Sequence, residues 1–406
     1  MSLNPKVSIC IPSYNHARFL PAAIESALAQ TYRSFEVVIV DDGSSDDSVP
    51  VAEAYAARYP ALINVLTHPG RRHLGIGMTA NLARRNARGE FWSGLPSDDV
   101  LYPQKLEEQV TLFDRHPNLG WVYGYADIID DQGKSRPGMP PFGEDITLAP
   151  NPLTTLIERN VVPAMTVLAR RARLEEIGSE DESLLYSDWY YWIRLLAHSE
   201  VAFIDKPLAG FRVHGKNTSE GVDLLENLQR GLEVMRLLQR TAPAMENELS
   251  SPRTRSVIEL QLCYHLFHLQ QRDAAKQSFW SALEIDPTLA RDSAFFSGWL
   301  RARTLETVYR FCTSAEHTGF VSWLLKALPP FATEELRPSL IAASQAEKAF
   351  ELAGNDRATA RKMALSCVMR DPGWLKDRAL RSVLYESLIG RQTMERLRRV
   401  KNRLRN

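Results

Sequence analysis

Two pairs of adjacent aspartates are the residues of this sequence whose types and spacing most clearly suggest chemistry. Asp41 and Asp42 follow directly on one largely apolar run. Asp98 and Asp99 follow closely on another. Carboxylate oxygens are the ligands that Mg²⁺ and Mn²⁺ prefer, and these ions share their remaining coordination positions with substrate phosphates. A single pair could simply cap the next helix, but two pairs at two strand ends favour a metal–diphosphate site.

The elements that must position these carboxylates are predicted from runs of apolar residues and from helical spacing. Strands are expected at 7–11, 35–40, 63–66 and 91–95, and helices at 19–30, 48–59, 78–87 and 103–114. This alternation is typical of βαβ units with right-handed crossovers and predicts an α/β fold, a mostly parallel sheet flanked by helices. Ligands of such sheets bind beyond the carboxyl ends of the strands, so residues at those ends should meet in one crevice.

Tyr14 and Asp41 should project into this crevice from neighbouring strand ends, because the first strand stops at Pro12. An aromatic ring can stack on a base, and a carboxylate can accept a hydrogen bond from a base or a sugar. The alternative for Tyr14 is an exposed aromatic residue in a turn. The glycine-rich stretch 75–80 does not complete a dinucleotide fingerprint, since Ala80 stands at its third glycine position, and this excludes a nicotinamide dehydrogenase.

The composition of the chain excludes several classes of protein. Its 406 residues suggest two or three domains, and 49 basic against 49 acidic residues leave no net charge to attract a nucleic acid. The four cysteines are far apart and form no C-x-x-C pair, so neither a zinc knuckle nor a disulfide framework is expected. No apolar run reaches the roughly 18 residues that span a bilayer, and the N-terminus lacks the features of a signal peptide. We therefore expect a cytoplasmic protein.

Several short motifs, in order along the chain, resemble those of the family 2 glycosyltransferases with a GT-A fold. They lie at 7–15, 29–32, 35–44, 89–91 and 95–99, and extend over about the first half of the chain. The resemblance implies a Rossmann-like α/β fold. It also implies an enzyme of the hexosyltransferase type, which moves a sugar from a nucleotide–sugar donor to an acceptor.

The resemblance assigns roles to individual residues of this sequence. Pro12 and Tyr14 belong to the turn that holds the nucleotide, with Tyr14 stacking on the base, and Asp41 would bond to the base. Asp98 is the residue expected to coordinate a divalent metal, Mn²⁺ or Mg²⁺, on the diphosphate of the nucleotide. Asp99 would support it as a second metal ligand.

Asp188 is expected to be the catalytic base. The stretch 186–195 resembles the Glu-Asp motif of the family, whose aspartate deprotonates the acceptor hydroxyl, with Ser187 in place of the glutamate. Helical spacing places Asp188 in the first turn of a helix, where the helix dipole favours the charged form that a general base needs. The alternative is that Asp188 only caps that helix.

The segment 211–219 resembles the Arg-x-His stretch of the family, which closes over the diphosphate. Arg212 and His214 alternate with apolar residues, so they should share one face of an extended run. The resemblance implies that Arg212 contacts the nucleotide diphosphate and that His214 is a metal or phosphate contact. A lone histidine is also common at a surface or in a core, so that alternative stays open.

After about residue 220 the sequence becomes almost entirely helical in pattern. The stretches 264–287 and 349–372 are each typical of a helix, a short turn and a second helix ended by Asp-Pro. They weakly resemble tetratricopeptide hairpins. This half could dock a protein partner, or it could buttress the first half.

The last residues, 391–406, place apolar side chains on one helical face and arginines over the rest. A basic amphipathic helix suits an anionic membrane surface, although a solvated terminus is the alternative. We expect peripheral attachment to the inner face of the membrane through this helix. The expected domains are a GT-A domain at 1–220, an all-helical domain at 221–390 and the basic helix at 391–406.

Two functions of different classes remain open. The first is an inverting glycosyltransferase that passes a sugar from a uridine diphosphate sugar to a glycan or lipid-linked glycan, in the synthesis of a bacterial surface polysaccharide or glycoconjugate. The second is an adaptor with a degenerate glycosyltransferase-like domain, whose helical half binds a protein. Pro96, which replaces the first acidic residue of the metal motif, and Ser187 favour the adaptor. Neither function involves a nucleic acid partner.

Overall fold

The structure is a computed structural model that describes residues 5–136, 139–215, 224–311, 319–353, 356–376, 380–381 and 383–384. The chain divides into two compact units, Met1–Ser250 and Ser251–Asn406, and each is described by itself.

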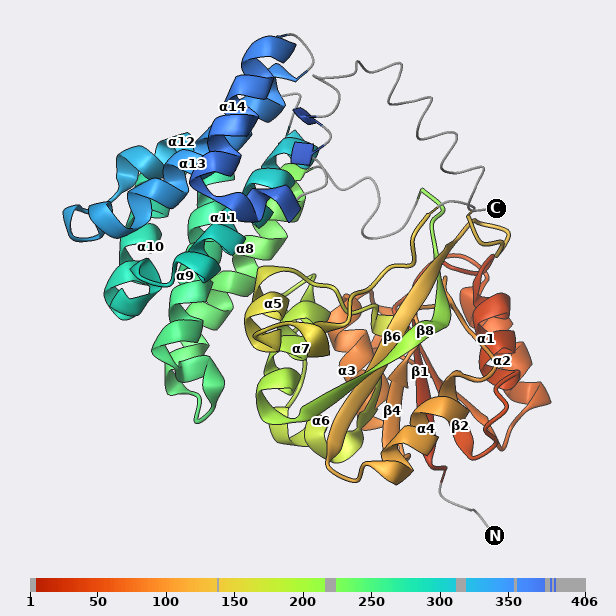
Figure 1. The fold of residues 1–406 in the computed structure, drawn as a ribbon. Coiled ribbons are helices and arrows are strands. Elements are labelled where there is room, and N and C mark those ends of the chain that lie inside the picture. The colour runs from red at the N-terminus through yellow and green to blue at the C-terminus, as the bar shows by residue number, and fades with distance from the viewer. Residues whose placement is uncertain are drawn as a thin grey trace. The chain divides into compact units, whose positions relative to one another are not determined.

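The first unit is built on one eight-stranded sheet (Figure 1). Its strands are β1 (Val7–Ser13), β2 (Phe35–Asp41), β3 (Ile63–Thr67), β4 (Phe91–Gly94), β5 (Val100–Leu101), β6 (Leu119–Ile129), β7 (Leu168–Arg170) and β8 (Glu200–Arg212). They lie in the order β3-β2-β1-β4-β7-β6-β8-β5. β1 runs parallel to β2 and β4, and β2 runs parallel to β3, whereas β7 is antiparallel to β4 and β6. The first four strands therefore form the parallel sheet that the sequence predicts.

Helices cover both faces of this sheet. α1 (Leu20–Leu28) and α2 (Ser48–Arg58) lie on one side, and α3 (Ile76–Arg85) lies on the other (Figure 1). The remaining helices of the unit are α4 (Lys105–Arg115), α5 (Pro152–Glu158), α6 (Arg171–Ile177), α7 (Ser187–His198) and α8 (Leu224–Thr241). All seven residues of β2 are buried, because a strand covered on both faces leaves neither side to water. The predicted α/β architecture is confirmed.

β1 differs from the expectation that Pro12 would end it. The strand pairs with β2 as far as Ser13, but its pairing with β4 stops at Cys10. The Ser13 carbonyl faces β2, where it accepts from Asp42 N–H. Because successive residues of a strand direct their backbone groups to opposite neighbours, Pro12 faces β4, at a level beyond the last paired residue of that strand. The missing N–H of proline therefore costs the sheet no hydrogen bond.

The two longest strands, β6 and β8, are not predicted by the sequence pattern. They pair in parallel with a register shift where Gly124 pairs with Ile204 and the next residue, Tyr125, pairs with Pro207. The irregularity accommodates Asp205 and Lys206, two polar residues that interrupt the apolar run of β8. A pattern that breaks in the middle is not recognisable as one strand, because its pairing depends on a partner far away in the sequence.

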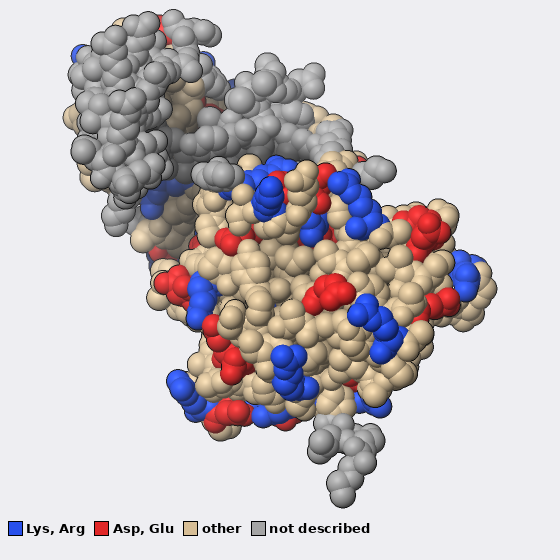
Figure 2. All heavy atoms as spheres, turned by 90° about the vertical axis from the view of Figure 1, so that its right-hand side faces the viewer, with Lys and Arg blue, Asp and Glu red and all other residues tan. Residues whose placement is uncertain are grey.

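Charges on the first unit are mixed in sign. Figure 2 shows basic and acidic side chains interspersed with uncharged residues over the face of this unit that it presents. The pairs Lys6–Asp114 and Arg18–Asp131, at 2.9 and 2.7 Å, are examples of exposed ion pairs of the unit. Such pairs are worth little in stability but prevent a strong field of one sign.

The second unit is helical in its described parts. Its helices are α9 (Pro252–His268), α10 (Arg272–Ile285), α11 (Ser293–Phe311), α12 (Phe320–Ala327), α13 (Thr333–Leu352) and α14 (Arg357–Arg370). α9 packs on α10 and α13 packs on α14, so both predicted hairpins form as pairs of neighbouring helices. Their likeness to tetratricopeptide repeats stays a prediction.

The boundary between the units lies after α8, whereas the sequence pattern places it near residue 220. α8 packs on α7, where the Tyr186 hydroxyl donates to Asn227 and the Tyr190 hydroxyl lies 3.3 Å from that of Thr241. These contacts join α8 to the first unit, which is why a boundary drawn from helical texture alone comes too early. The predicted basic helix at 391–406 lies outside the described residues. Among the described helices, none combines the length and apolar character that crossing a bilayer requires.

Candidate nucleotide and metal site

The carboxyl ends of β1, β2 and β4 lie next to one another, because β1 is flanked by the other two strands. Pro12 pairs with Val40, and Tyr14 and Asp41 follow directly on these two residues. Asp98 lies in the loop between β4 and β5. The sheet thus brings the predicted residues Pro12, Tyr14, Asp41 and Asp98 to one edge, where open α/β sheets bind ligands.

Asp41 is buried, and the turn that follows it engages its carboxylate. Oδ1 accepts hydrogen bonds from the backbone N–H groups of Gly43 (3.0 Å) and Ser44 (2.8 Å), and Oδ2 accepts one from the Ser44 hydroxyl (2.5 Å). α2 begins only at Ser48, after the N-cap residue Asp47, so Asp41 is no helix cap. Each carboxylate oxygen has two lone pairs, so Oδ2 retains capacity to accept from a base.

Asp42 has a positioning role that sequence reasoning missed. Its Oδ1 accepts from Leu74 N–H (2.7 Å), and its Oδ2 accepts from Gly75 N–H (2.9 Å) and lies 2.9 Å from His73 Nδ1. Gly43, at φ +77°, brings the same turn so close that a Cβ there would lie 2.7 Å from the backbone of residues 71–73. Asp42 therefore fixes the loop that leads into α3. A local sequence pattern does not predict this role of Asp42, because its hydrogen-bond partners lie about thirty residues later in the chain.

Tyr14 is 41% exposed and stacks on His73, with ring centroids 4.1 Å apart and an interplanar angle of 26°. Asp42 holds the imidazole of His73 in place. A base that stacks on Tyr14 would use the other face of the phenol ring or displace the imidazole. Tyr14 and His73 thus form an aromatic surface of two rings, and the alternative of Tyr14 as an exposed aromatic residue in a turn stays open.

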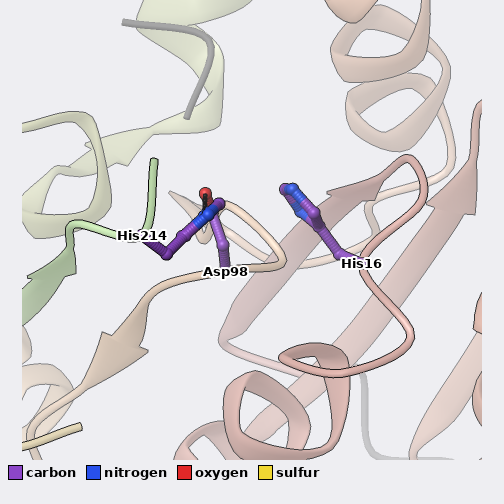
Figure 3. Close-up of side chains that lie close together, drawn as sticks. All are labelled: His16, Asp98 and His214. Carbon is purple, nitrogen blue, oxygen red and sulfur yellow. Dashed lines mark hydrogen bonds and ion pairs between the residues drawn. The ribbon is translucent and has the colours of Figure 1, made fainter. Parts of the chain in front are cut away.

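Three side chains from separate segments converge at the same edge (Figure 3). His16 lies in the loop after β1, Asp98 lies in the loop after β4, and His214 follows β8. Their ligand atoms all lie within 4.8 Å of one another, and they are the group of this kind found among the described residues. His214 Nε2 is 3.1 Å from Asp98 Oδ2, and Ser97 Oγ is 2.8 Å from His16 Nδ1 and orients that ring.

This group fits a divalent cation by its chemistry. Burial lowers the pKa of His16, and a neutral imidazole is the form that binds a metal. Two nitrogens and one carboxylate oxygen suit Mn²⁺, whereas Mg²⁺ prefers oxygen ligands. Sequence reasoning named Asp98 and His214 but missed His16. The only available signal was that His16 lies two residues after Tyr14, in the same turn.

Asp99 and Arg212 are not brought into this group. Asp99 is buried, and its Oδ1 accepts from the backbone N–H of Arg212 (2.8 Å). Burial raises the pKa of Asp99 well above its ordinary value, and the charge of Asp98 adds to the rise. The guanidinium of Arg212 donates to the backbone carbonyls of Asp98 (2.6 Å), Asp130 (3.0 Å) and Asp131 (3.1 Å). Both residues therefore hold the loop that carries Asp98, whatever further contacts a nucleotide makes.

Asp188 lies in the first turn of α7, as predicted, but the N-cap position belongs to Tyr186. The capping alternative for Asp188 is therefore wrong. Its Oδ1 accepts from Trp189 N–H (2.7 Å), and its Oδ2 accepts from Asn160 Nδ2 (3.4 Å). Burial raises the pKa of Asp188, and these two hydrogen bonds oppose the rise. The helix position was expected to favour the charged form, but desolvation outweighs it.

α7 is anchored to the sheet by Trp192, one turn after Asp188. Its ring lies 6.0 Å from that of Trp121 on β6 and 6.2 Å from that of Trp92 on β4. β4 is also the strand that leads to Asp98, so the helix that carries the predicted base packs against the strand that precedes the candidate metal ligand. Aromatic residues at this spacing fix a helix firmly because each buries a large area.

Comparisons with known proteins agree with this geometry. Residues 8–173 match the family model of glycosyl transferase family 2. An uncharacterised glycosyltransferase of Rickettsia typhi is 32% identical over 222 residues, and one of Nostoc is 34% identical over 223 residues. The matches cover 53% and 52% of this chain, and the chain spans 66% of the length of each relative.

The fold also resembles a solved structure. The crystal structure of S. aureus TarS 1–349 in complex with UDP-GlcNAc superposes with a TM-score of 0.51 at 19% identity, and covers 94% of this chain and 91% of its own. At that identity the likeness concerns the fold alone. The family model and these relatives thus identify a glycosyl transferase family 2 domain at residues 8–173, and the first unit that contains it has a GT-A-like fold.

Proposed function

We propose that this chain is an inverting glycosyltransferase that moves a sugar from a uridine diphosphate sugar to an acceptor hydroxyl. The observation that carries the proposal is the convergence of His16, Asp98 and His214 beside the Tyr14–Asp41 edge of the sheet. TarS, which shares the fold, has been crystallised with UDP-GlcNAc, and this supports a uridine nucleotide as the donor. We propose a glycan or lipid-linked glycan of a bacterial surface polysaccharide or glycoconjugate as the acceptor.

His16, Asp98 and His214 would hold a divalent cation, for which Mn²⁺ is the best fit. When bound, such a cation neutralises charge that develops on a leaving diphosphate. Tyr14 would stack on the base, and Asp41 would accept a hydrogen bond from it. Arg212 and Asp99 would keep the Asp98 loop in register, through the contacts that they make with its backbone and with each other.

Asp188 would act on the acceptor. Its carboxylate accepts the proton of the acceptor hydroxyl as the oxygen forms a bond to the anomeric carbon. The bond between that carbon and the diphosphate oxygen breaks on the opposite face, and the diphosphate leaves with the electron pair. The single displacement inverts the anomeric configuration.

A transfer assay with a panel of radiolabelled nucleotide–sugars tests this proposal. Asp188→Asn should lower turnover by about a hundredfold or more, because the amide cannot accept the proton, and should leave donor binding nearly unchanged. Glu175→Gln, which replaces an exposed carboxylate of α6, serves as the control and should leave turnover unchanged. Full turnover of the Asp188→Asn enzyme would show that the assignment of the base is wrong.

The adaptor is the second candidate, because Pro96 and Ser187 replace acidic residues of the family motifs. Calorimetric titration with uridine diphosphate, with and without Mn²⁺, distinguishes the two functions. Metal-dependent binding that is lost in Asp98→Ala supports the enzyme. Absence of binding to the intact chain favours the adaptor.

We also propose that the protein is cytoplasmic and attaches peripherally to the inner membrane face. The support is the basic amphipathic sequence at 391–406. In flotation with vesicles containing anionic phospholipid, the full chain should float, and a variant that ends at residue 390 should not. Equal flotation of both proteins would exclude this segment as the anchor.

A further inference from the structure

The segment that leads into α7 is fixed to α3 by one buried amide side chain. Asn81 Nδ2 donates to the Glu180 carbonyl (3.0 Å), and Glu180 N–H donates to Asn81 Oδ1 (3.0 Å). Asn81 is 1% exposed, so no water competes for these bonds. α3 also touches the segment directly, since a Cβ at Gly77 would lie 3.1 Å from Glu182 Cα and 3.3 Å from the Asp181 carbonyl oxygen.

The side chain of Glu180 continues this connection towards the predicted base. Its Oε2 accepts a hydrogen bond from the Ser187 hydroxyl (2.7 Å), and Ser187 is the first residue of α7 and the neighbour of Asp188. Glu180 is 8% exposed and Ser187 is 3% exposed. Burial raises the pKa of Glu180, whereas the charge of Arg84 and the bond from Ser187 favour its carboxylate form. A hydrogen bond to a buried carboxylate is among the stronger ones in proteins, so it fixes the start of α7 well.

The same helix α3 is held at its other end by the nucleotide half of the site. Asp42 accepts from the N–H groups of Leu74 and Gly75, and Gly75 is the N-cap residue of α3. The turn that contains Asp41 and the segment that contains Glu180 are therefore both hydrogen-bonded to α3 or to its cap. α3 spans only Ile76–Arg85, which leaves little room for one end to shift without the other.

We propose that Glu180 and Asn81 are positioning residues for Asp188, and that α3 ties the base to the turn that binds the nucleotide. The inference rests on the proposed function, in which Asp188 is the base. In this reading the Ser187 side chain has a defined use. The Ser187 hydroxyl donates to the carboxylate of Glu180, seven residues upstream, whereas the family motif would place a carboxylate at position 187 itself.

A double-mutant cycle on Glu180 and Ser187 tests the proposal. Glu180→Ala and Ser187→Ala each remove the same hydrogen bond, so each should lower kcat about tenfold and leave KM for the donor unchanged, because only the base is displaced. The double variant should be no worse than either single variant, since partners in one interaction are not additive. Glu180→Gln should keep most of the activity, because its amide oxygen still accepts from Ser187. Asn81→Ala should resemble Glu180→Ala.

Controls separate positioning from general damage. Glu176→Ala removes an exposed carboxylate of α6, which is ion-paired with Arg173, and should leave kcat unchanged. Thermal unfolding of every variant is measured beside its kinetics, and Ser187→Ala, the smallest change, decides the matter where Glu180→Ala does not fold. Additive losses in the cycle, or a rise in donor KM that accounts for the loss, would overturn the proposal.

A readout without substrate distinguishes this inference from the proposed function. The Trp189 amide, which donates to Asp188, reports the order of the first turn of α7. Its hydrogen exchange should be faster in Glu180→Ala and Ser187→Ala than in the unaltered chain or in Glu176→Ala. Faster exchange in a chain that transfers no sugar would contradict the proposed function and leave the positioning role supported. Unchanged exchange would contradict the positioning role even if the chain transfers sugar.

Discussion

Asp188 shows how a single carboxylate is tuned by competing surroundings. Burial raises its pKa, and the hydrogen bonds from Trp189 N–H and Asn160 lower it, with burial the stronger effect. A general base works only when it is deprotonated, so a raised pKa moves the acid limb of the rate profile upward. Within the proposed function, the acid limb of kcat should therefore lie above the ordinary range of an aspartate.

Asn160→Ala provides the test at this scale. The variant removes a hydrogen bond that favours the carboxylate form, so the pKa of Asp188 should rise further, and the acid limb of kcat should move up by about 0.5 pH unit. Asn64→Ala, an exposed amide on β3, should leave the profile in place. An acid limb that stays in place or moves down in Asn160→Ala would contradict the conclusion that the hydrogen bond from Asn160 lowers the pKa of Asp188.

Individual site residues differ in how far sequence alone could find them. Asp98, His214 and Asp188 stand in recognisable motifs, and the structure places the first two in one cluster and the third in the first turn of α7. His16 and Glu180 stand in no such motif. Their roles arise because distant segments pack against them, and a spacing rule along one chain cannot contain that information.

Lys105 is a buried lysine in α4 whose charged form is unfavourable in the core. It is fully buried in α4, and its Nζ donates to Ser93 Oγ (2.8 Å) and to the Val167 carbonyl (3.2 Å). Burial lowers the pKa of Lys105 to about 7. These bonds join α4 to β4 and to the residue that precedes β7. The ammonium form must then be held by neutral oxygens in the core, which is costly.

The free energy of unfolding should consequently depend on pH through Lys105. Between about pH 7 and 10 the unfolded chain binds a proton that the folded chain does not, so stability rises with pH in that range. From pH 7 to 9 the unaltered chain should gain on the order of 1–2 kcal/mol relative to Lys105→Met, measured by urea unfolding. Lys206→Met, which removes an exposed lysine, serves as the control. Parallel curves for Lys105→Met would contradict the lowered pKa.

The elements themselves were largely predictable in the first part of the chain. β1 to β4 and the helices between them follow apolar runs and helical spacing, because each is buried in a regular way. β6 and β8 escaped prediction because the polar pair Asp205–Lys206 sits at a register shift. Their pairing is decided by tertiary contacts, which local propensity does not record.

At the scale of the whole chain, the assignment of α8 to the first unit has a measurable outcome. A fragment of residues 1–250 retains the contacts of α8 with Tyr186 and Tyr190, whereas a fragment of residues 1–220 lacks them. We expect the longer fragment to bind uridine diphosphate with Mn²⁺ within a fewfold of the full chain. The shorter fragment should unfold at a temperature several degrees lower, because the face of α7 that α8 covers becomes exposed to water.

Calorimetry and thermal unfolding of the two fragments check this expectation. Equal unfolding temperatures would favour a boundary near residue 220, where the sequence becomes helical in pattern. That pattern predicts a helical region correctly, but a helix that packs on the preceding domain has the same composition as one that packs on the following domain. Only the contacts distinguish them.

The continuous pairing of β1 with β2 limits how the candidate site could be re-engineered. Val7 to Ser13 are matched one to one with Phe35 to Asp41, and Tyr14 and His16 follow at fixed intervals. One inserted residue in β1 would reverse the faces of every later side chain in the strand and displace both rings. Within the proposed function, a library that seeks a new donor preference should therefore vary side chains at positions 12–16 and keep their number constant. The length of the turn at 130–135 should be kept as well, because the Asp130 and Asp131 carbonyls accept from the same guanidinium of Arg212 that holds the Asp98 loop.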